Sequence, residues 1–132
     1  MSDIDGLLTA ARAARERAHA PYSGFKVGAA VRADDGSVHL GANVENAAYP
    51  EGICAEAAAI AAMVMAGRTR IAEILVIADS PQPVTPCGGC RQRIREFAAP
   101  DTPVHLANMA GTLESVTLEE LLPKSFGPEF LA

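Results

Sequence analysis

Apolar residues at the start of the chain recur at a helical period. The first helix is predicted from Leu7, Leu8, Ala11, Ala14 and Ala18, with charged residues between them. It should end before Pro21. Two β-rich runs, Val27–Ala33 and Val38–Asn43, flank an Asp-Asp-Gly turn at residues 34–36 and predict a hairpin.

The middle of the chain contains a predicted helix with almost no polar face. Residues Ala55–Ala66 are rich in Ala, Ile and Met, and Gly67 closes the segment. A helix that is apolar all round must be buried on every side. We therefore expect it to contact another subunit, and the alternative is a central core helix in a monomer.

The later segments alternate between strands and helices. The remaining elements predicted are a buried strand Ile71–Ala78, a largely polar helix Gly88–Phe97, a strand Val104–Ala107 and a short strand ending at Val116. A brief helix then begins after Thr117, which caps it with Glu120 as the partner in a capping box. This order predicts an α/β sandwich on a mixed sheet.

Composition and charge narrow the class of protein. The 132 residues favour one domain, residues 1–132, large enough to bury a core without disulfides. The net charge of −5 argues against a nucleic-acid surface, which needs a basic stripe. The longest uncharged apolar run, residues 57–66, is too short to span a membrane, and the start does not resemble a signal peptide. We expect a cytoplasmic protein without nucleic-acid or membrane partners.

Three cysteines carry the candidate chemistry. Cys87 and Cys90 open a predicted helix at a spacing that puts both thiols on one side. Alone, this pair could be a redox pair or half of a structural zinc site. Cys54 also precedes a predicted helix, and the sequence has no fourth cysteine. Three thiolates can hold Zn²⁺ and leave its fourth position open, as in catalytic sites.

Other side chains bear on that open position. His19, His39 and His105 lie at a helix end or within strands, where surface or packing roles are expected. Glu56, two residues after Cys54, faces a different direction from that ligand and can serve the open position as a proton shuttle. The alternative is an ordinary first-turn glutamate stabilised by the helix dipole.

Three segments together resemble the small homotetrameric cytidine deaminases. They are Asn-Val-Glu-Asn at 43–46, Cys-Ala-Glu at 54–56 and Pro-Cys-Gly-Gly-Cys-Arg-Gln at 86–92. The similarity extends from residues 21–23 to 125–127. The resemblance implies a three-layer α/β/α sandwich around a mixed, mostly five-stranded sheet. It also implies one Zn²⁺ per subunit, held by Cys54, Cys87 and Cys90 in an all-cysteine variant of the site.

The resemblance further implies an activity. Cytidine and deoxycytidine would be hydrolysed to uridine and deoxyuridine plus ammonia in pyrimidine salvage, with Glu56 moving the protons and no organic cofactor. Substrate contacts are implied for Phe25, Asn43, Glu45, Ala55, Ala47, Tyr49 and Phe126. Of these, Ala47 and Tyr49 would come from one neighbouring subunit and Phe126 from another. The alternatives are a turn formed by Asn43 and Glu45 and ordinary packing of the phenylalanines.

Ala57 departs from the family pattern. Many relatives have arginine directly after the catalytic glutamate, where it offsets the thiolate charge. We expect Arg91, in the first turn after Cys90, or the helix amides to supply this compensation.

Two other functions remain open from the sequence. One is deamination of another aminopyrimidine such as a nucleoside antibiotic, although the 43–45 motif favours ordinary nucleosides. The other is a non-catalytic zinc or redox module that binds a partner, for which Glu56 would be dispensable. Editing of polynucleotides is disfavoured by the acidic charge.

Overall fold

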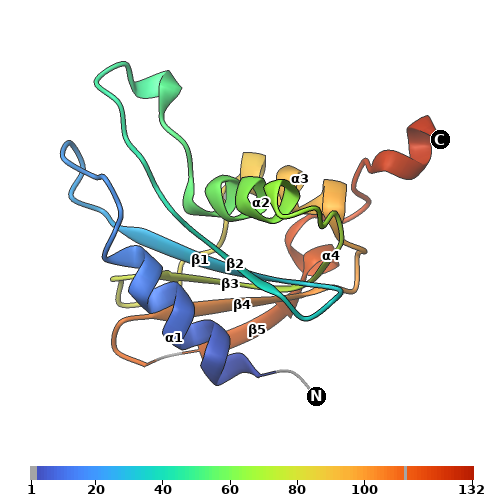
Figure 1. Cartoon of the computed structure of the whole chain (residues 1–132), viewed down its shortest axis with the longest axis horizontal. Coiled ribbons are helices and arrows are strands. Elements are labelled where there is room, and N and C mark those ends of the chain that lie inside the picture. The colour runs from blue at the N-terminus through green and yellow to red at the C-terminus, as the bar shows by residue number, and fades with distance from the viewer. Residues whose placement is uncertain (1–2, 112) are drawn as a thin grey trace.

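A five-stranded mixed sheet with helices on both faces forms the body of the molecule (Figure 1). The computed structural model describes residues 3–111 and 113–132. The strands are β1 (Val27–Ala33), β2 (Val38–Ala42), β3 (Ile71–Ala78), β4 (Pro103–Asn108) and β5 (Leu113–Thr117). Their order is β2-β1-β3-β4-β5, with β3 and β4 parallel and the other neighbours antiparallel. The predicted α/β/α sandwich on a five-stranded mixed sheet is confirmed.

The hairpin follows the predicted boundaries closely. β1 pairs with β2 so that Ala30 lies opposite Leu40, and the chain reverses through Gly36 at a φ of 88°. That backbone conformation costs glycine little, which explains the glycine at this turn. On its other edge, β1 pairs with β3, a partner that is distant in sequence.

Helix α1 (Ile4–Arg15) covers one face of the sheet. It begins at the cap Asp3, which accepts a hydrogen bond from the Gly6 amide at 2.9 Å, and it ends at Arg15 rather than at Ala18. Its buried residues Leu7 and Ala11 pack against apolar side chains of β1, β3 and β4. The strand residues in this cluster are Ala30, Leu75, Ile77 and Ala107.

Helices α2 (Ala55–Met65), α3 (Gly88–Phe97) and α4 (Leu118–Leu121) cover the opposite face (Figure 1). Their main core contains Met63, Ile74, Val76, Ile94, Val104, Leu106 and Leu118. The Thr117 and Glu120 capping box of α4 is confirmed. Two short 3₁₀ helices, Tyr49–Glu51 and Pro128–Leu131, complete the elements.

Close contact between β2 and α2 places the first turn of α2. A Cβ on Gly41 would lie 2.3 Å from the Ala59 nitrogen and 2.4 Å from the Ala55 oxygen. Only a residue without a side chain lets the two backbones approach this closely. Gly41 therefore sets how near the start of α2 lies to the sheet.

Helix α2 buries only one of its apolar faces within the protomer. Ala55, Ala59 and Met63 face the core, whereas Val64 and Met65 are 41% and 87% exposed. The remaining apolar face is therefore free to contact another chain. No helix in the described part of the chain has the length and apolarity needed to cross a bilayer.

Candidate active site

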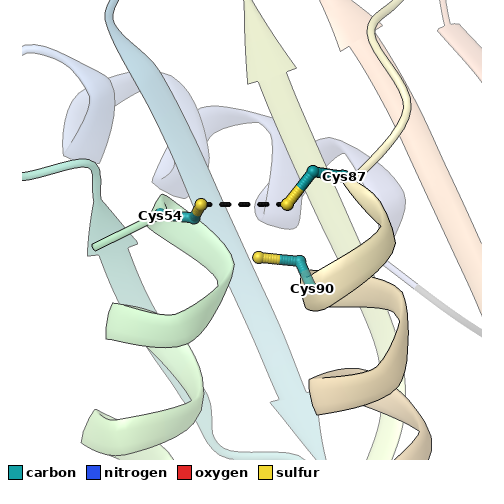
Figure 2. Close-up of side chains that lie close together, drawn as sticks. All are labelled: Cys54, Cys87 and Cys90. Atoms are coloured by element: carbon teal, nitrogen blue, oxygen red, sulfur yellow. Dashed lines mark hydrogen bonds between the residues drawn. The ribbon is translucent and has the colours of Figure 1, made fainter. Parts of the chain in front are cut away.

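The three cysteines converge where α2 and α3 begin (Figure 2). Cys54 is the N-cap of α2, Cys87 is the N-cap of α3, and Cys90 is the third residue of α3. The Sγ atoms of Cys54 and Cys87 are 3.9 Å apart, and all three Sγ atoms lie within 4.8 Å of one another. The predicted convergence of three thiols at helix starts is confirmed.

The helix starts and the burial act in opposite directions on these thiols. The Cys90 amide donates a hydrogen bond that lowers the pKa of the Cys87 thiol. Burial raises the pKa of the Cys54 and Cys90 thiols, and the neighbouring Glu56 and sulfur charges add to the effect. Because these last two thiols ionise reluctantly on their own, a bound cation would stabilise the site.

The donor set fits a zinc ion. All three cysteines are reduced, and within residues 3–111 and 113–132 no histidine or carboxylate joins their cluster. Soft thiolate sulfurs at this separation suit Zn²⁺, and three of them leave one coordination position for water or substrate. The cluster of Cys54, Cys87 and Cys90 is the zinc-binding site of the chain.

Glu56 is buried beside the thiols. It is the second residue of α2 and only 4% exposed. Burial raises the pKa of its carboxyl group, while its own backbone amide and the charge of Arg93 act in the opposite direction. A buried carboxyl group with a raised pKa is suited to accept and return protons.

A cavity of about 160 Å³ brings most of these groups together. It is lined by Val27, Asn43, Cys54, Ala55, Glu56, Val76, Val84, Thr85 and Cys87. Five other predicted substrate contacts, all in the described part of the chain, do not line it: Phe25, Glu45, Ala47, Tyr49 and Phe126. One protomer therefore assembles the thiols, Glu56, Ala55 and Asn43, and leaves the remaining predicted contacts outside.

Asn43 and Glu45 hold the loop that precedes β1. The Asn43 amide accepts from the Val27 nitrogen at 2.8 Å and donates to the Phe25 oxygen at 2.9 Å. Glu45 accepts from the backbone nitrogens of Tyr22 and Ser23 and from the Ser23 hydroxyl. The pKa of Glu45 is lowered mainly by the hydrogen bond from the Ser23 hydroxyl and, to a smaller extent, by the one from the Ser23 amide. The turn-forming role considered for this pair is thus present in the protomer.

The outlying aromatic residues are exposed. Tyr49 is 75% exposed and lies 5.9 Å from the Tyr22 ring, beside a second cavity of about 320 Å³. Phe126 is 55% exposed and stacks on Phe130 with ring centroids 5.4 Å apart. This second cavity is larger than the first but contains no thiol, so the thiol-lined cavity is the candidate site.

Arg91, the arginine expected to offset the thiolate charge, hydrogen-bonds to groups other than the sulfurs, whereas a helix amide, that of Cys90, does act on the Cys87 thiol. The three guanidinium nitrogens of Arg91 donate to the Pro86 oxygen at 2.7 Å, the Leu121 oxygen at 2.7 Å and the Thr85 hydroxyl at 3.0 Å. These bonds tie the loop before Cys87 to the end of α4. Arg91 therefore shapes the entry to the site instead of contacting its sulfurs.

Comparison with known proteins agrees with the geometry. The sequence profile of the cytidine and deoxycytidylate deaminase zinc-binding region matches residues 1–106. The chain belongs to the cytidine and deoxycytidylate deaminase family. Cytidine deaminases of Sporosarcina psychrophila and Halalkalibacterium halodurans are 43% and 46% identical to it. These alignments cover 98% and 96% of this chain, and 96% of each relative.

Solved structures of this deaminase family share the fold. The crystal structure of cytidine deaminase from Burkholderia pseudomallei is 43% identical and superposes with a TM-score of 0.91, covering 95% of this chain and 100% of that one. Cytidine deaminase from Mycobacterium tuberculosis is 34% identical with a TM-score of 0.84, covering 96% of this chain and 99% of that one.

Two sets of contacts in this deaminase-family chain were not predicted from the sequence. Arg93 Nη1 lies 3.6 Å from Cys90 Sγ, and the three-residue spacing on one helix could have indicated it. Gln92 donates to the Phe126 oxygen at 2.9 Å, and Arg95 donates to the Ser125 hydroxyl at 2.9 Å. Arg95 also pairs with Glu129. No local pattern indicated that α3 would hold the C-terminal segment.

The histidines take no part in the thiol cluster of this deaminase-family chain. His105 is buried between Glu73 Oε1 at 2.8 Å and the Ser115 hydroxyl at 2.7 Å. His39 contacts the Ser37 hydroxyl at 2.8 Å. From the sequence we expect surface or packing roles for the histidines. Within the described residues, the candidate metal cluster contains cysteines alone.

Proposed function

We propose that this chain is a single-domain, zinc-dependent deaminase, residues 1–132, that hydrolyses cytidine and deoxycytidine to uridine, deoxyuridine and ammonia. The observation that carries the proposal is the cavity in which two of three clustered thiols, Cys54 and Cys87, lie beside the buried carboxyl group of Glu56. A purely structural zinc site would have no use for an open coordination position next to a carboxyl group.

The reaction replaces the C4 amino group of cytosine by an oxygen atom from water. When bound to Cys54, Cys87 and Cys90, zinc supplies a polarised water whose pKa is lowered toward neutrality. Glu56 would accept one proton from that water and deliver it to ring nitrogen N3 while the water oxygen bonds to C4. The same carboxylate would then take the proton of the new C4 hydroxyl group and pass it to the amino group, so that the C4–N bond breaks, a C4 carbonyl forms and ammonia departs. Burial raises the pKa of Glu56, which makes its protonated form accessible for this return step.

The substrate contacts proposed within one protomer are Phe25, Asn43, Glu45 and Ala55. Asn43 lines the cavity, and its amide retains donor and acceptor capacity beyond its bonds to residues 25 and 27. A ribose hydroxyl could therefore bind an amide and a carboxylate that are already held in place by the loop. Holding the loop and binding the sugar are compatible roles for Asn43 and Glu45.

We further propose that the enzyme is a homotetramer with sites shared between subunits. Ala47 and Tyr49 would come from one neighbour and Phe126 from another. The proposal is supported by the apolar face of α2 that the protomer leaves exposed and by the exposure of Tyr49 and Phe126. Three reduced cysteines used as ligands also favour the cytoplasm as its compartment.

Glu56→Gln tests the proposed activity. We expect the parent protein to convert cytidine and deoxycytidine, followed as loss of pyrimidine absorbance, and the variant to lose about 10²–10⁴-fold in rate. The variant should keep its zinc content, because glutamine is isosteric and Glu56 is not a ligand. Equal rates in both proteins would contradict the role of Glu56. A zinc-loaded parent with no turnover on either nucleoside would instead favour an antibiotic substrate or a binding module.

A further inference from the structure

Arg93 extends from α3 toward the thiol cluster. Its Nη1 lies 3.6 Å from the Sγ of Cys90, one turn earlier on the same helix. Its positive charge also acts on Glu56, whose carboxyl pKa it lowers. The guanidinium therefore contacts one of the three sulfurs and adds positive charge to the surroundings of the buried carboxyl group.

The zinc site needs positive charge from outside the cluster. Three thiolates exceed the charge of one Zn²⁺, and the carboxylate of Glu56 adds more negative charge in a buried position. Cys90 is the most deeply buried of the three sulfur ligands, so its charge is the least compensated by water. A guanidinium close to the Cys90 sulfur therefore supplies positive charge where the negative charge is least compensated.

Of the positions considered for offsetting the thiolate charge, only Arg93 contacts a sulfur. Arg91 is occupied by Thr85, Pro86 and Leu121. Ala57 carries no charge. Within residues 3–111 and 113–132, Arg93 is the one cationic side chain that donates a hydrogen bond to a cluster sulfur.

Gly89 leaves room for this contact. A Cβ at position 89 would lie 3.0 Å from Arg93 Nη1, which is tighter than nine in ten real Cβ contacts, so the guanidinium would have to shift by a few tenths of an ångström. Gly89 itself has no positive φ that would require glycine. The missing side chain at Gly89 therefore leaves room for the guanidinium beside Cys90.

We propose that Arg93 is a positioning residue that offsets the thiolate charge at Cys90 and thereby sets the affinity and the electrophilicity of the bound zinc. This inference rests on the proposed function only in that the cysteines hold zinc. An N–H donor to a ligand sulfur draws electron density from it, so the sulfur donates less to the metal and the metal polarises its open position more strongly. Loss of such an outer contact typically costs 10–100-fold in metal affinity or activity.

The test measures the metal site directly. Arg93→Gln removes the charge, Arg93→Lys keeps it, and Arg70→Gln is the matched control, because exposed Arg70 lies beyond the far end of α2. Zinc affinity is measured by competition with a chromogenic chelator. Without Arg93 the excess negative charge of the buried thiolates is no longer offset, and we expect this loss to outweigh the stronger electron donation by Cys90. Arg93→Gln should therefore bind zinc about 10–100-fold more weakly, Arg93→Lys should recover most of the loss, and Arg70→Gln should match the parent.

Cobalt substitution provides a spectroscopic measurement that would not change if Arg93 had only a structural role. In the Co²⁺ form, the thiolate-to-metal charge-transfer bands should shift to lower energy in Arg93→Gln, because the Cys90 sulfur becomes more electron-rich. Unchanged zinc affinity and unchanged bands in Arg93→Gln would overturn the inference, even if the parent deaminates cytidine. A parent that binds zinc but does not turn over would sink the proposed activity and leave this inference intact.

Discussion

Side-chain partners decide roles at this site that residue type alone leaves open. Arg91 and Arg93 are both arginines just after Cys90, yet the first holds backbone oxygens and the second contacts the sulfur. The sequence did not reveal the hydrogen-bond partners of Arg91, because they lie in α4 and in the loop before Cys87. For Cys54, Cys87, Cys90 and Glu56, by contrast, sequence position alone determined the placement at the helix starts.

Ser23→Ala tests how Glu45 is held, through its dependence on pH. The hydrogen bonds from Ser23 lower the folded pKa of Glu45 below its ordinary value of 4.5. A lowered folded pKa contributes stability that is present above the ordinary value and is lost as the pH falls through the folded value. Removing the hydroxyl should raise the Glu45 pKa, so the loop at residues 22–25 should detach at a higher pH.

Carbon-13 NMR titration of the Glu45 carboxyl group measures this shift. Ser37→Ala is the matched control, because its hydroxyl bonds Asp35 at 2.6 Å instead. We expect the Glu45 titration to move upward in Ser23→Ala and to stay in place in Ser37→Ala. Identical Glu45 titrations in the parent and Ser23→Ala would show that the hydroxyl does not hold the carboxylate.

At the scale of elements, the site depends on where two helices begin. α2 brings Cys54 and Glu56, and α3 brings Cys87 and Cys90, because both helices lie on the same face of the sheet (Figure 1). The close contacts at Gly28 and Gly41 set the distance of one helix on each face. At Gly28, an added Cβ would lie 2.2 Å from the Ala11 oxygen in α1.

Gly41→Ala and Gly28→Ala form a matched pair on opposite faces of the sheet. Each forces a helix backbone away from a strand, and we expect each to lower the free energy of unfolding by about 1–3 kcal/mol. Only Gly41→Ala should also weaken zinc binding, because it displaces the first turn of α2, which carries Cys54. Urea unfolding of the metal-free proteins and chelator competition measure the two effects. Equal zinc affinity in both variants would refute the dependence on α2.

At the scale of the whole molecule, the predicted site is divided. The protomer gathers two of the thiols, Cys54 and Cys87, with Glu56, Ala55 and Asn43 around one cavity, whereas Tyr49 and Phe126 are exposed on its surface. Phe126 is nevertheless held, because Gln92 and Arg95 of α3 bind its segment. An exposed aromatic residue whose backbone is held by hydrogen bonds is suited to contact a neighbouring subunit.

Mixing two inactive variants tests the shared site. Glu56→Gln lacks the proton shuttle, and Phe126→Ala lacks the aromatic residue proposed for a neighbour. Co-expressed mixed tetramers should regain part of the parent activity, because some sites combine an intact Glu56 with an intact Phe126. Glu56→Gln mixed with Glu56→Ala is the control and should stay inactive. No recovery in the first mixture, or an active monomer by light scattering, would refute sharing.

The sequence by itself determined most secondary structure and the core of the site. The boundaries of β1, β3 and α3 match the predictions from periodicity, and Cys87 and Cys90 lie together at the start of α3 as their spacing indicated. These features are local, since period and spacing decide which way each side chain points. The resemblance supplied the five-stranded sandwich and the family, which the comparisons confirm.

Only the tertiary structure decided which distant groups meet. It paired β1 with β3, ended α1 at Arg15, and joined Asn43 and Glu45 to the loop at residues 22–27. It also directed Arg91 away from the sulfurs and Arg93 toward Cys90. The physical reason is that long polar side chains find partners across packed elements, and those partners depend on how the layers stack.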